Sequence, residues 1–347
     1  MQPPAAAALD AAATALVRVG GLSAAPEEKL TPLGQHLARM PLEPRIGKTL
    51  IYGALLGCVD PALTIAAAMS LARSPFLSPF DKRAEAQSAR APFCNEMSDQ
   101  MALLRAYEAW KDEREMHGAG AARRFAEAHF LSANGMEELS ALRGKLAATL
   151  SELGLPRSTY DATGSKAVGS QANLVRALLC AGLYPNIVKV RMPDTRYEKT
   201  AQGAVEATNE DARAIKFFLE PGGRVFLHPS SALFSAAKFD HHRWLVYNSK
   251  RQVDGGKLYV QEVTAVSQLA LLLFGGQVVV HHDKGTVTID GMITFDAPGR
   301  VAVLVRELRA ELDKLLLQKI VDPALEIGSH PVLEAIINLI ATERAGL

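Results

Sequence analysis

The chain has 347 residues, of which 48% are hydrophobic, and this is enough for about two or three domains with cores of their own. Lysine and arginine number 38 against 37 aspartates and glutamates, a balance that excludes a strong overall attraction to polyanions or anionic membranes. Any nucleic-acid surface must therefore be a local patch.

The cysteines Cys58, Cys94 and Cys180 lie far apart, with no CxxC pair and no histidines at zinc-finger spacing. This spacing argues against a zinc site and against a disulfide framework. The alanine-rich start, residues 1–15, lacks the basic residues of a secretory signal or transit peptide. We expect reduced thiols, no bound metal and a cytoplasmic or nuclear location.

The first 45 residues predict a helix, a short ribbon and a second helix. Apolar residues recur at helical spacing up to Val19, and Gly20-Gly21 ends that helix. Residues 22–30 fit a turn or short strand, and Thr31-Pro32 has the signature of a helix start, an N-cap residue followed by proline. This order is typical of a winged-helix unit, which we place at residues 1–45.

Residues 46–157 predict a helical bundle with one long loop, Arg73 to Met97. Helical periodicity recurs over Ile46–Cys58, Pro61–Ala72, Ser98–Glu115, Ala121–Leu131 and Met136–Leu153. The apolar stretch at residues 50–71 is about long enough to span a bilayer, but Asp60-Pro61 divides it. We therefore expect two buried helices and no membrane partner.

Residues 158–170 are rich in Ser, Thr, Gly and Asp and predict a linker, which we take as the main domain boundary. A helix at Gln171–Ala181 comes next. Short strand-like runs follow at Ile187–Arg191, Ile215–Leu219, Val225–Leu227, Trp244–Asn248, Leu258–Val263, Val278–His281, Thr286–Ile289 and Met292–Phe295. Short strands separated by Gly and Pro favour a small β-barrel over residues 171–297.

The last segment, residues 298–347, predicts a helical extension. Its helices span Arg300–Ile320 and Pro331–Ala341, and the first carries one apolar stripe, formed by Leu304, Leu308, Leu312 and Leu315. The fold class is therefore multidomain α + β, an all-α helical bundle followed by a small β-barrel and C-terminal helices.

The segment Gly47-Lys48-Thr49 ends as a phosphate-binding P-loop does. However, Leu42 replaces the opening glycine, Pro44 removes an amide donor, and no apolar strand precedes the segment. No strand ends in Asp-Glu to hold magnesium as a Walker B acid would. The chain lacks the motifs for ATP hydrolysis by itself, and nucleotide binding at this segment is kept only as a third, weaker hypothesis.

Other candidates for chemistry have simpler explanations. The pairs His241-His242 and His281-His282 are adjacent in sequence, and neighbouring side chains on a strand point to opposite faces, so neither pair predicts a metal site. Cys180 lies in an apolar run that predicts a buried thiol, and no Gly-x-Ser-x-Gly elbow is present. We predict no catalytic residue.

Basic and aromatic residues interleave from residue 184 onward. The basic ones include Lys189, Arg191, His228, Lys250 and Arg251, and the aromatic ones are Tyr184, Tyr197, Phe226, Trp244 and Tyr247. Such residues hold a single strand by pairing with phosphates and stacking on bases. Because acidic residues lie nearby and barrel cores also need aromatics, spacing alone leaves a binding face and a structural role equally open.

Ordered motifs run through most of the chain. They are Leu30-Thr-Pro-Leu-Gly34, Met40-Pro-Leu-Glu-Pro44, Leu63-Thr-Ile-Ala-Ala67, Pro75-Phe76, Ser98-Asp99, Leu179-Cys-Ala-Gly-Leu-Tyr-Pro185, His228-Pro-Ser-Ser231, Trp244-Leu-Val-Tyr247 and Leu273-Phe-Gly-Gly276. In this order they closely resemble the C-terminal region of the DEAH-box/RHA-type RNA helicases. The resemblance implies a winged-helix unit at 1–45, a ratchet-like bundle at 46–157 and an OB-fold at 171–297.

In that family these units lie over two RecA-like motor domains and enclose single-stranded RNA. The resemblance implies an accessory module that binds and guides RNA for ATP-driven 3′-to-5′ unwinding by motor domains that this chain does not contain. ATP and magnesium are expected only in the motor domains, and no cofactor in this chain. The implied partners are single-stranded or structured RNA, RecA-like domains in cis or in trans, and an activator protein.

The resemblance also implies which residues touch RNA. With the basic pair that follows the fourth strand-like run, the predicted set is Ser98, Asp99, Lys189, Arg191, His228, Pro229, Ser230, Ser231, Lys250 and Arg251. The same residues could cap a helix and close a turn instead. After Asp99 many relatives carry histidine where this chain has Gln100, an amide that cannot become cationic. The alternative function is a protein-interaction scaffold that uses the same folds without RNA.

Overall fold

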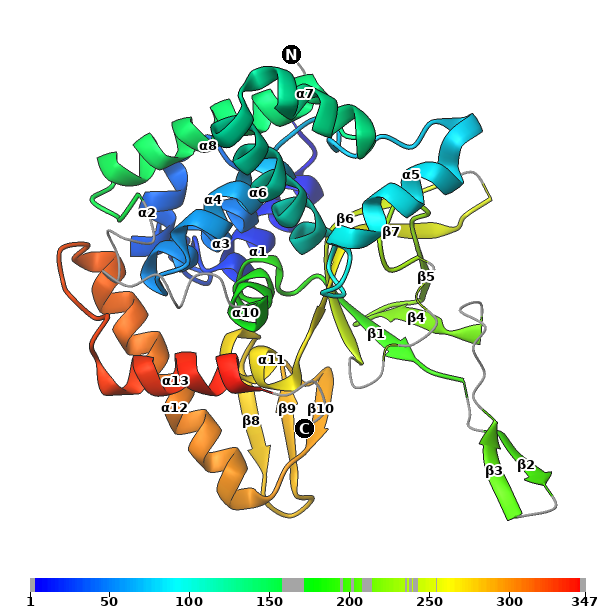
Figure 1. Ribbon diagram of the computed structural model, residues 1–347. Helices are drawn as coiled ribbons and strands as arrows, with labels where there is room; N and C mark the ends of the chain where they lie inside the picture. The colour runs from blue at the N-terminus through cyan, green and yellow to red at the C-terminus, as the bar shows by residue number, and fades with distance from the viewer. Residues whose placement is uncertain are drawn as a thin grey trace.

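The computed structural model describes residues 4–157, 172–193, 196–200, 203–207, 214–234, 236, 239, 243–253 and 255–343 of the chain. The predicted linker and the pair His241-His242 lie outside these residues. A helical body carries a small β-barrel on one side and a second sheet with two helices at the C-terminal end (Figure 1). The predicted fold class, a helical bundle with a barrel and C-terminal helices, is confirmed, whereas the domain limits stay predictions.

The N-terminal segment contains helix α1 (Ala6–Val19), a single β-bridge and helix α2 (Pro32–Ala38). Leu22 and Leu30 form the bridge. The hydroxyl of Thr31 accepts a hydrogen bond of 2.9 Å from the backbone N of Gly34 and donates one of 2.5 Å to the carbonyl of Gly20. Thr31 therefore starts α2 and also ties it to the end of α1, as its N-cap signature predicts.

The helical bundle is built around α3 (Pro44–Leu55) and α4 (Val59–Met69). Every residue of α4 except Asp60 is buried, so this helix is apolar on all sides because neighbours cover all sides. These neighbours include α3, α6 (Asp99–His117), α8 (Ala133–Glu152) and α10 (Ala172–Leu183), while α7 (Ala119–Ala128) packs on α6 and α8. The two predicted buried helices are confirmed, and no helix among the described residues is long and apolar enough to cross a membrane.

The predicted long loop between α4 and α6 is wrong in one part, because it contains helix α5 (Arg83–Arg90) between two short 3-10 turns, Phe80–Lys82 and Ala91–Phe93. Only Ala86 of α5 is buried, so the helix shows almost no apolar periodicity. Its sequence, rich in Arg, Ala, Glu and Gln, nevertheless consists of good helix formers.

The barrel closes in the order β1 (Ile187–Arg191), β4 (Lys216–Leu219), β5 (Arg224–Leu227), β7 (Leu258–Val266) and β6 (Trp244–Gln252). Only β5 and β7 pair in parallel, and the other neighbours are antiparallel. Its own core includes Val188, Leu245, Val260 and Val263, all fully buried. A two-stranded pairing of β2 (Arg196–Thr200) with β3 (Gly203–Ala207) was missed, because these runs carry few apolar residues.

The expectation of one barrel from all eight strand-like runs is wrong for the last three. β8 (Val278–His281), β9 (Thr286–Ile289) and β10 (Ile293–Asp296) form a separate three-stranded sheet. Helix α11 (Gln268–Phe274) interrupts the chain after β7, and Ile289, Ile293 and Phe295 are buried in the core of the helical body rather than in that of the barrel. Strand propensity predicted the strands but could not assign them to a sheet.

Helices α12 (Gly299–Val321) and α13 (Pro331–Thr342) form the predicted C-terminal extension. Leu312 and Leu315 of α12 are buried, but Leu304 is 67% exposed, so the predicted apolar stripe does not continue to that residue. α12 contacts α2, α11 and the edge of the second sheet, and it therefore joins the two ends of the described chain.

Candidate nucleic-acid interface

The start of α6 is fastened to the barrel by Ser98 and its neighbours. The Ser98 hydroxyl caps α6 by accepting a hydrogen bond of 3.1 Å from the backbone N of Met101. The same hydroxyl lies 2.5 Å from the hydroxyl of Thr264 on β7, and the backbone N of Ala265 donates to the carbonyl of Met97. Ser98 is 1% exposed, so in this conformation it caps α6 and connects that helix to β7. We call this contact between the start of α6, the end of α5 and the barrel the joint. The predicted RNA contact of Ser98 stays a prediction.

Asp99 is the centre of this joint. Its carboxylate accepts hydrogen bonds of 2.6 Å from the backbone N of Ala232 and of 2.9 Å from that of Val263, and it lies 3.6 Å from the guanidinium of Arg90. Burial raises the pKa of Asp99, whereas Arg90 and the two amides act in the opposite direction. One carboxylate therefore holds the turn after β5, the strand β7 and the segment before α6 together.

Arg90, at the end of α5, continues the joint to the turn His228–Ser231. It donates a hydrogen bond of 2.5 Å to the carbonyl of Ser230, and its guanidinium lies 4.2 Å from the ring centroid of Phe76. The turn itself is closed by the backbone N of Ser231, which donates to the carbonyl of His228, and by the contact of His228 Nδ1 with the Ser230 hydroxyl at 2.7 Å. The alternative role, closing a turn, is thus present in the structure.

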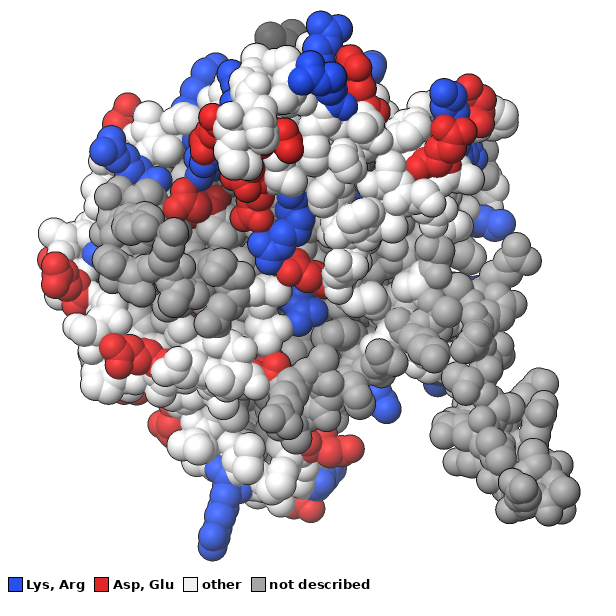
Figure 2. Space-filling view, viewed as in Figure 1, with Lys and Arg blue, Asp and Glu red and all other residues white. Residues whose placement is uncertain are grey.

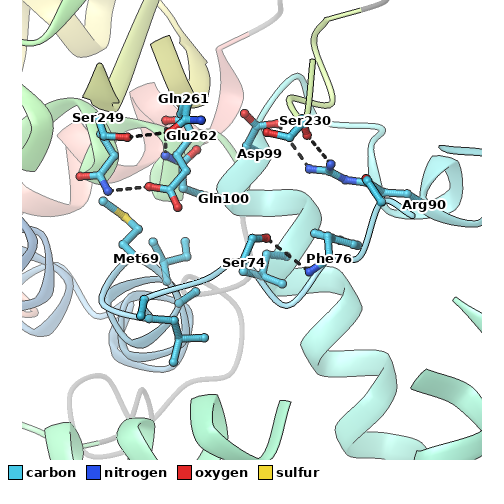
Figure 3. A pocket seen from close by; sticks show the side chains of 17 residues that line it. Met69, Ser74, Phe76, Arg90, Asp99, Gln100, Ser230, Ser249, Gln261 and Glu262 are labelled. Carbon is cyan, nitrogen blue, oxygen red and sulfur yellow. Dashed lines mark hydrogen bonds and ion pairs between the residues drawn. The ribbon is translucent and has the colours of Figure 1, made fainter. Parts of the chain in front are cut away.

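A groove of 390 Å³ opens between the bundle and the barrel at this joint (Figure 3). Side chains of α4, of the segment around α5, of α6 and of β6 and β7 line it, among them Arg90, Asn248 and Glu262. Two buried polar atoms of these residues, Arg90 Nε and Asn248 Oδ1, have no hydrogen-bond partner among the described residues. Because buried polar groups are normally paired, this donor and this acceptor favour a polar ligand in the groove.

Gln100 lies on the floor of the groove. Its Nε2 donates to the carbonyl of Glu262 at 2.7 Å, and its Oε1 accepts from the hydroxyl of Thr264 at 2.5 Å. Asn248 donates to the Glu262 carboxylate, while burial raises the pKa of that carboxyl. Both ends of the side-chain amide are therefore bound within the protein, and a neutral residue suits the position.

A continuous set of aromatic and basic side chains covers the outer faces of β5, β7 and the far half of β6. We call it the aromatic–basic strip and define it as Arg224, Phe226, His228, Arg251, Lys257 and Tyr259. The rings of Phe226 and Tyr259 lie 5.8 Å apart, and His228 lies 6.2 Å from Tyr259. These outward-facing rings alternate along the strands with the buried Val225 and Leu227.

The cations of the strip flank its rings. Arg224 lies 5.0 Å and Lys257 5.7 Å from the ring centroid of Phe226, and Arg251 is the cross-strand partner of Tyr259. Burial lowers the pKa of His228 and Arg251 lowers it further, against the opposing effect of Asp99, so this imidazole is harder to protonate than a free one. The strip therefore offers three flat faces and three permanent positive charges.

The strip and the groove are parts of one surface. Ser249 and Gln261, which line the groove, are cross-strand partners on β6 and β7, and the next outward-facing pair along these strands is Arg251 with Tyr259. Elsewhere, on the face shown in Figure 2, basic and acidic side chains of the described residues are interspersed, in keeping with the balanced total charge. Of the predicted set, the described residues that join this surface are Asp99, the turn His228–Ser231 and Arg251. Lys250 is the cross-strand partner of the buried Val260 and therefore has the opposite register.

Lys189 and Arg191 lie elsewhere on the barrel. They are on β1, whose neighbours are β4 and β6, so β5 and β7 are on the other side of the barrel. Lys189 lies 3.8 Å from the carboxylate of Glu220 and 5.4 Å from the ring centroid of Trp244, and Arg191 lies 6.0 Å from that of Phe218. The structure does not bring these two residues to the strip, and their RNA contact stays a prediction.

Sequence reasoning missed Arg90, Arg224, Lys257 and Tyr259. The signal for Tyr259 was its outward register opposite Arg251 across the β6–β7 hairpin, which becomes visible only when the strands are paired. Of the predicted aromatics whose side chains the structure describes, Tyr184, Trp244 and Tyr247 are buried and belong to the cores, and Phe226 is in the strip. The side chain of Tyr197 lies outside the described part.

The other candidates have structural roles. Gly47-Lys48-Thr49 lies inside α3, where the backbone N of Gly47 donates to the carbonyl of Glu43, so these amides cannot hold a phosphate as a P-loop does. Cys58 and Cys180 are buried free thiols. In the part of the chain that the structure describes, no group of His, Cys, Asp and Glu is arranged to hold a metal ion.

Three family profiles match the chain in succession. The profile "Helicase associated domain (HA2), ratchet-like" matches residues 43–132, "Oligonucleotide/oligosaccharide-binding (OB)-fold" matches 175–278, and "C-terminal domain in RNA helicases" matches 285–342. The groove therefore lies between the ratchet-like domain and the OB-fold, and the strip lies on the OB-fold.

Curated relatives match nearly the whole chain. The human "Putative ATP-dependent RNA helicase DHX57" is 36% identical over 99% of this chain and 26% of its own length. The human "ATP-dependent DNA/RNA helicase DHX36" is 34% identical over 91% of the chain and 31% of its own length. The chain thus spans about a quarter to a third of these relatives. With its HA2, OB-fold and RNA helicase C-terminal domains in order, the chain belongs to the C-terminal region of the DEAH-box RNA helicase family.

Proposed function

We propose that the chain binds single-stranded RNA on the aromatic–basic strip and guides it into the groove between the barrel and α6. The observation that carries this proposal is the pair of neighbouring outward-facing rings, Phe226 and Tyr259, flanked by three cations and continuous with the groove. Every base has a flat face, so such rings bind bases of any sequence, at about 1–3 kcal/mol per stacked base. The cations attract the phosphates between them.

The groove adds hydrogen bonding to this stacking. The unpaired Arg90 Nε is a donor and the unpaired Asn248 Oδ1 an acceptor, and a base edge or ribose offers complements to both. Asp99 supports this site indirectly, because it holds the turn at Ser230 and the guanidinium of Arg90 in place. Within the proposal Asp99 is a positioning residue.

The proposed role in a whole helicase follows from the relatives. They carry the names of ATP-dependent helicases, and we infer that this chain works with RecA-like motor domains, in cis or in trans, that bind ATP and magnesium and drive 3′-to-5′ unwinding. An activator protein and structured RNA are further proposed partners. A cytoplasmic or nuclear location is part of the same proposal.

Fluorescence anisotropy with a labelled oligouridine tests the binding. Because about three cations of the strip meet phosphates, we expect the logarithm of the affinity to fall with the logarithm of salt concentration with a slope of about −2, at about −0.7 per phosphate. We also expect no RNA-stimulated ATP hydrolysis by the chain alone. Absence of binding, or binding that salt does not weaken, would contradict the proposal and favour the protein-interaction scaffold.

A further inference from the structure

A cavity of 440 Å³ lies where the N-terminal helices meet α12, and it shares no lining residue with the groove. Its walls come from the end of α1, the start of α2, α3, the end of α11 and α12. Much of the lining is apolar, provided by Leu33, Phe274, Leu316 and Ile320. A volume of this size falls within the range of about 300–1,000 Å³ that small-molecule sites occupy.

Lys48, the lysine of the false P-loop, faces this cavity from α3. Its ammonium lies 5.4 Å from the ring centroid of Tyr52, and no hydrogen bond or ion pair joins it to any described residue. Arg309 on α12 differs, because it donates to the carbonyls of Leu272 and Gly275 at 3.1 and 2.5 Å and approaches Asp313 at 3.5 Å. Arg309 is thus used to close the end of α11. Of the two other cations in the lining, Arg18 is exposed, and Lys48 is the one that is partly buried and left for a ligand.

The charges around the cavity are unbalanced. Arg18, Lys48 and Arg309 stand against one carboxylate, that of Asp313. Burial lowers the pKa of Lys48 to about 8, with Asp313 acting to raise it, Arg309 to lower it and the Cys180 thiol on α10 to raise it. A partly desolvated cation without a hydrogen-bonded or ion-paired partner, in an apolar cavity with excess positive charge, is suited to an anion that also carries apolar surface.

We propose that this cavity binds a small organic anion, a carboxylate or sulfonate on an aromatic apolar body, whose charged group pairs with the ammonium of Lys48. The apolar body would lie against Phe274, Leu316 and Ile320. Because α3 and α12 both line the cavity, such a ligand connects the C-terminal helices to the N-terminal ones. Its binding raises the stability of the folded chain with the logarithm of the ligand concentration, once that concentration exceeds the dissociation constant.

Two fluorescent probes of the same apolar body test the proposal on the full chain. 8-Anilinonaphthalene-1-sulfonate carries the anionic group, and N-phenyl-1-naphthylamine lacks it. Lys48→Met nearly keeps the length of the side chain. We expect it to weaken the binding of the anionic probe about tenfold, the value of one charged hydrogen bond, and to leave the binding of the neutral probe unchanged. Asp313→Asn removes the competing carboxylate and is expected to tighten the anionic probe.

A pH titration of the unmodified chain gives a test without substitution. Pairing needs the protonated ammonium, so the affinity for the sulfonate is full below the pKa of Lys48, about 8, and falls as pH rises through it. The bound anion itself moves that pKa upward. Three results would each overturn the proposal. Lys48→Met could bind the anionic probe as tightly as the unmodified chain does, it could lose affinity for both probes equally, or the affinity for the anionic probe could be independent of pH.

Discussion

We expect Asp99→Ala to lower the free energy of unfolding by about 3–5 kcal/mol, the range found when one partner of a buried ion pair is removed. The substitution leaves the guanidinium of Arg90 without its carboxylate and the backbone N–H groups of Ala232 and Val263 without their acceptor. Urea unfolding followed by the fluorescence of Trp110 and Trp244 measures the loss.

A double-mutant cycle shows whether this loss comes from the joint. Combining Asp99→Ala with Arg90→Ala removes both charges, so we expect the double variant to be less destabilised than the sum of the single ones, with a coupling of about 0.5–3 kcal/mol. The matched control is Glu138→Ala on the exposed side of α8, for which a change within about 0.5 kcal/mol is expected. If the losses of unfolding free energy in Asp99→Ala and Arg90→Ala simply add, the interaction between these two residues is not the cause of the destabilisation.

The second large effect concerns the two rings of the strip. We expect Phe226→Ala and Tyr259→Ala each to weaken binding of single-stranded RNA at least tenfold, since one stacked base is worth about 1–3 kcal/mol. The salt slope should stay the same, because neither ring carries charge. Anisotropy titrations at several salt concentrations separate the two quantities.

Two further variants serve as controls for the rings. Arg251→Gln should lower the salt slope by about 0.7 while the rings are kept. Phe80→Ala removes a ring that is 85% exposed and also lies beside an arginine, at 4.8 Å from Arg83, but is not part of the strip. We expect that variant to bind as the unmodified chain does, and a loss equal to that of Phe226→Ala would mean that any exposed ring contributes.

Much of the fold follows from local patterns in the sequence. Thr31-Pro32 predicted the start of α2, and apolar periodicity predicted α3, α4 and α6. These elements were predictable because helix caps and buried helix faces require particular residue types at fixed local spacing. The helix α5 buries only Ala86 and therefore has no apolar periodicity to predict it. The assignment of β8, β9 and β10 to a second sheet depends on pairing between strands, which no local pattern contains.

The candidate site was predictable only in pieces. Asp99 and the turn at His228–Ser231 were both predicted, by resemblance, but the hydrogen bond that joins Asp99 to Ala232 crosses 133 residues of sequence. Basic residues looked equivalent in sequence, yet pairing of the strands places Arg251 beside Tyr259 and Lys189 on the opposite side of the barrel. Register and barrel closure therefore select the members of the strip.

The most direct test of the central claim is photo-crosslinking of the chain to an RNA that carries 4-thiouridine, followed by mass spectrometry of the crosslinked peptides. We predict crosslinks in residues 224–230 and 249–261, which contain the strip and its continuation into the groove. Crosslinks confined to β1 or to α12 and α13 would contradict the account, because the RNA would then lie on a surface without the paired rings of Phe226 and Tyr259.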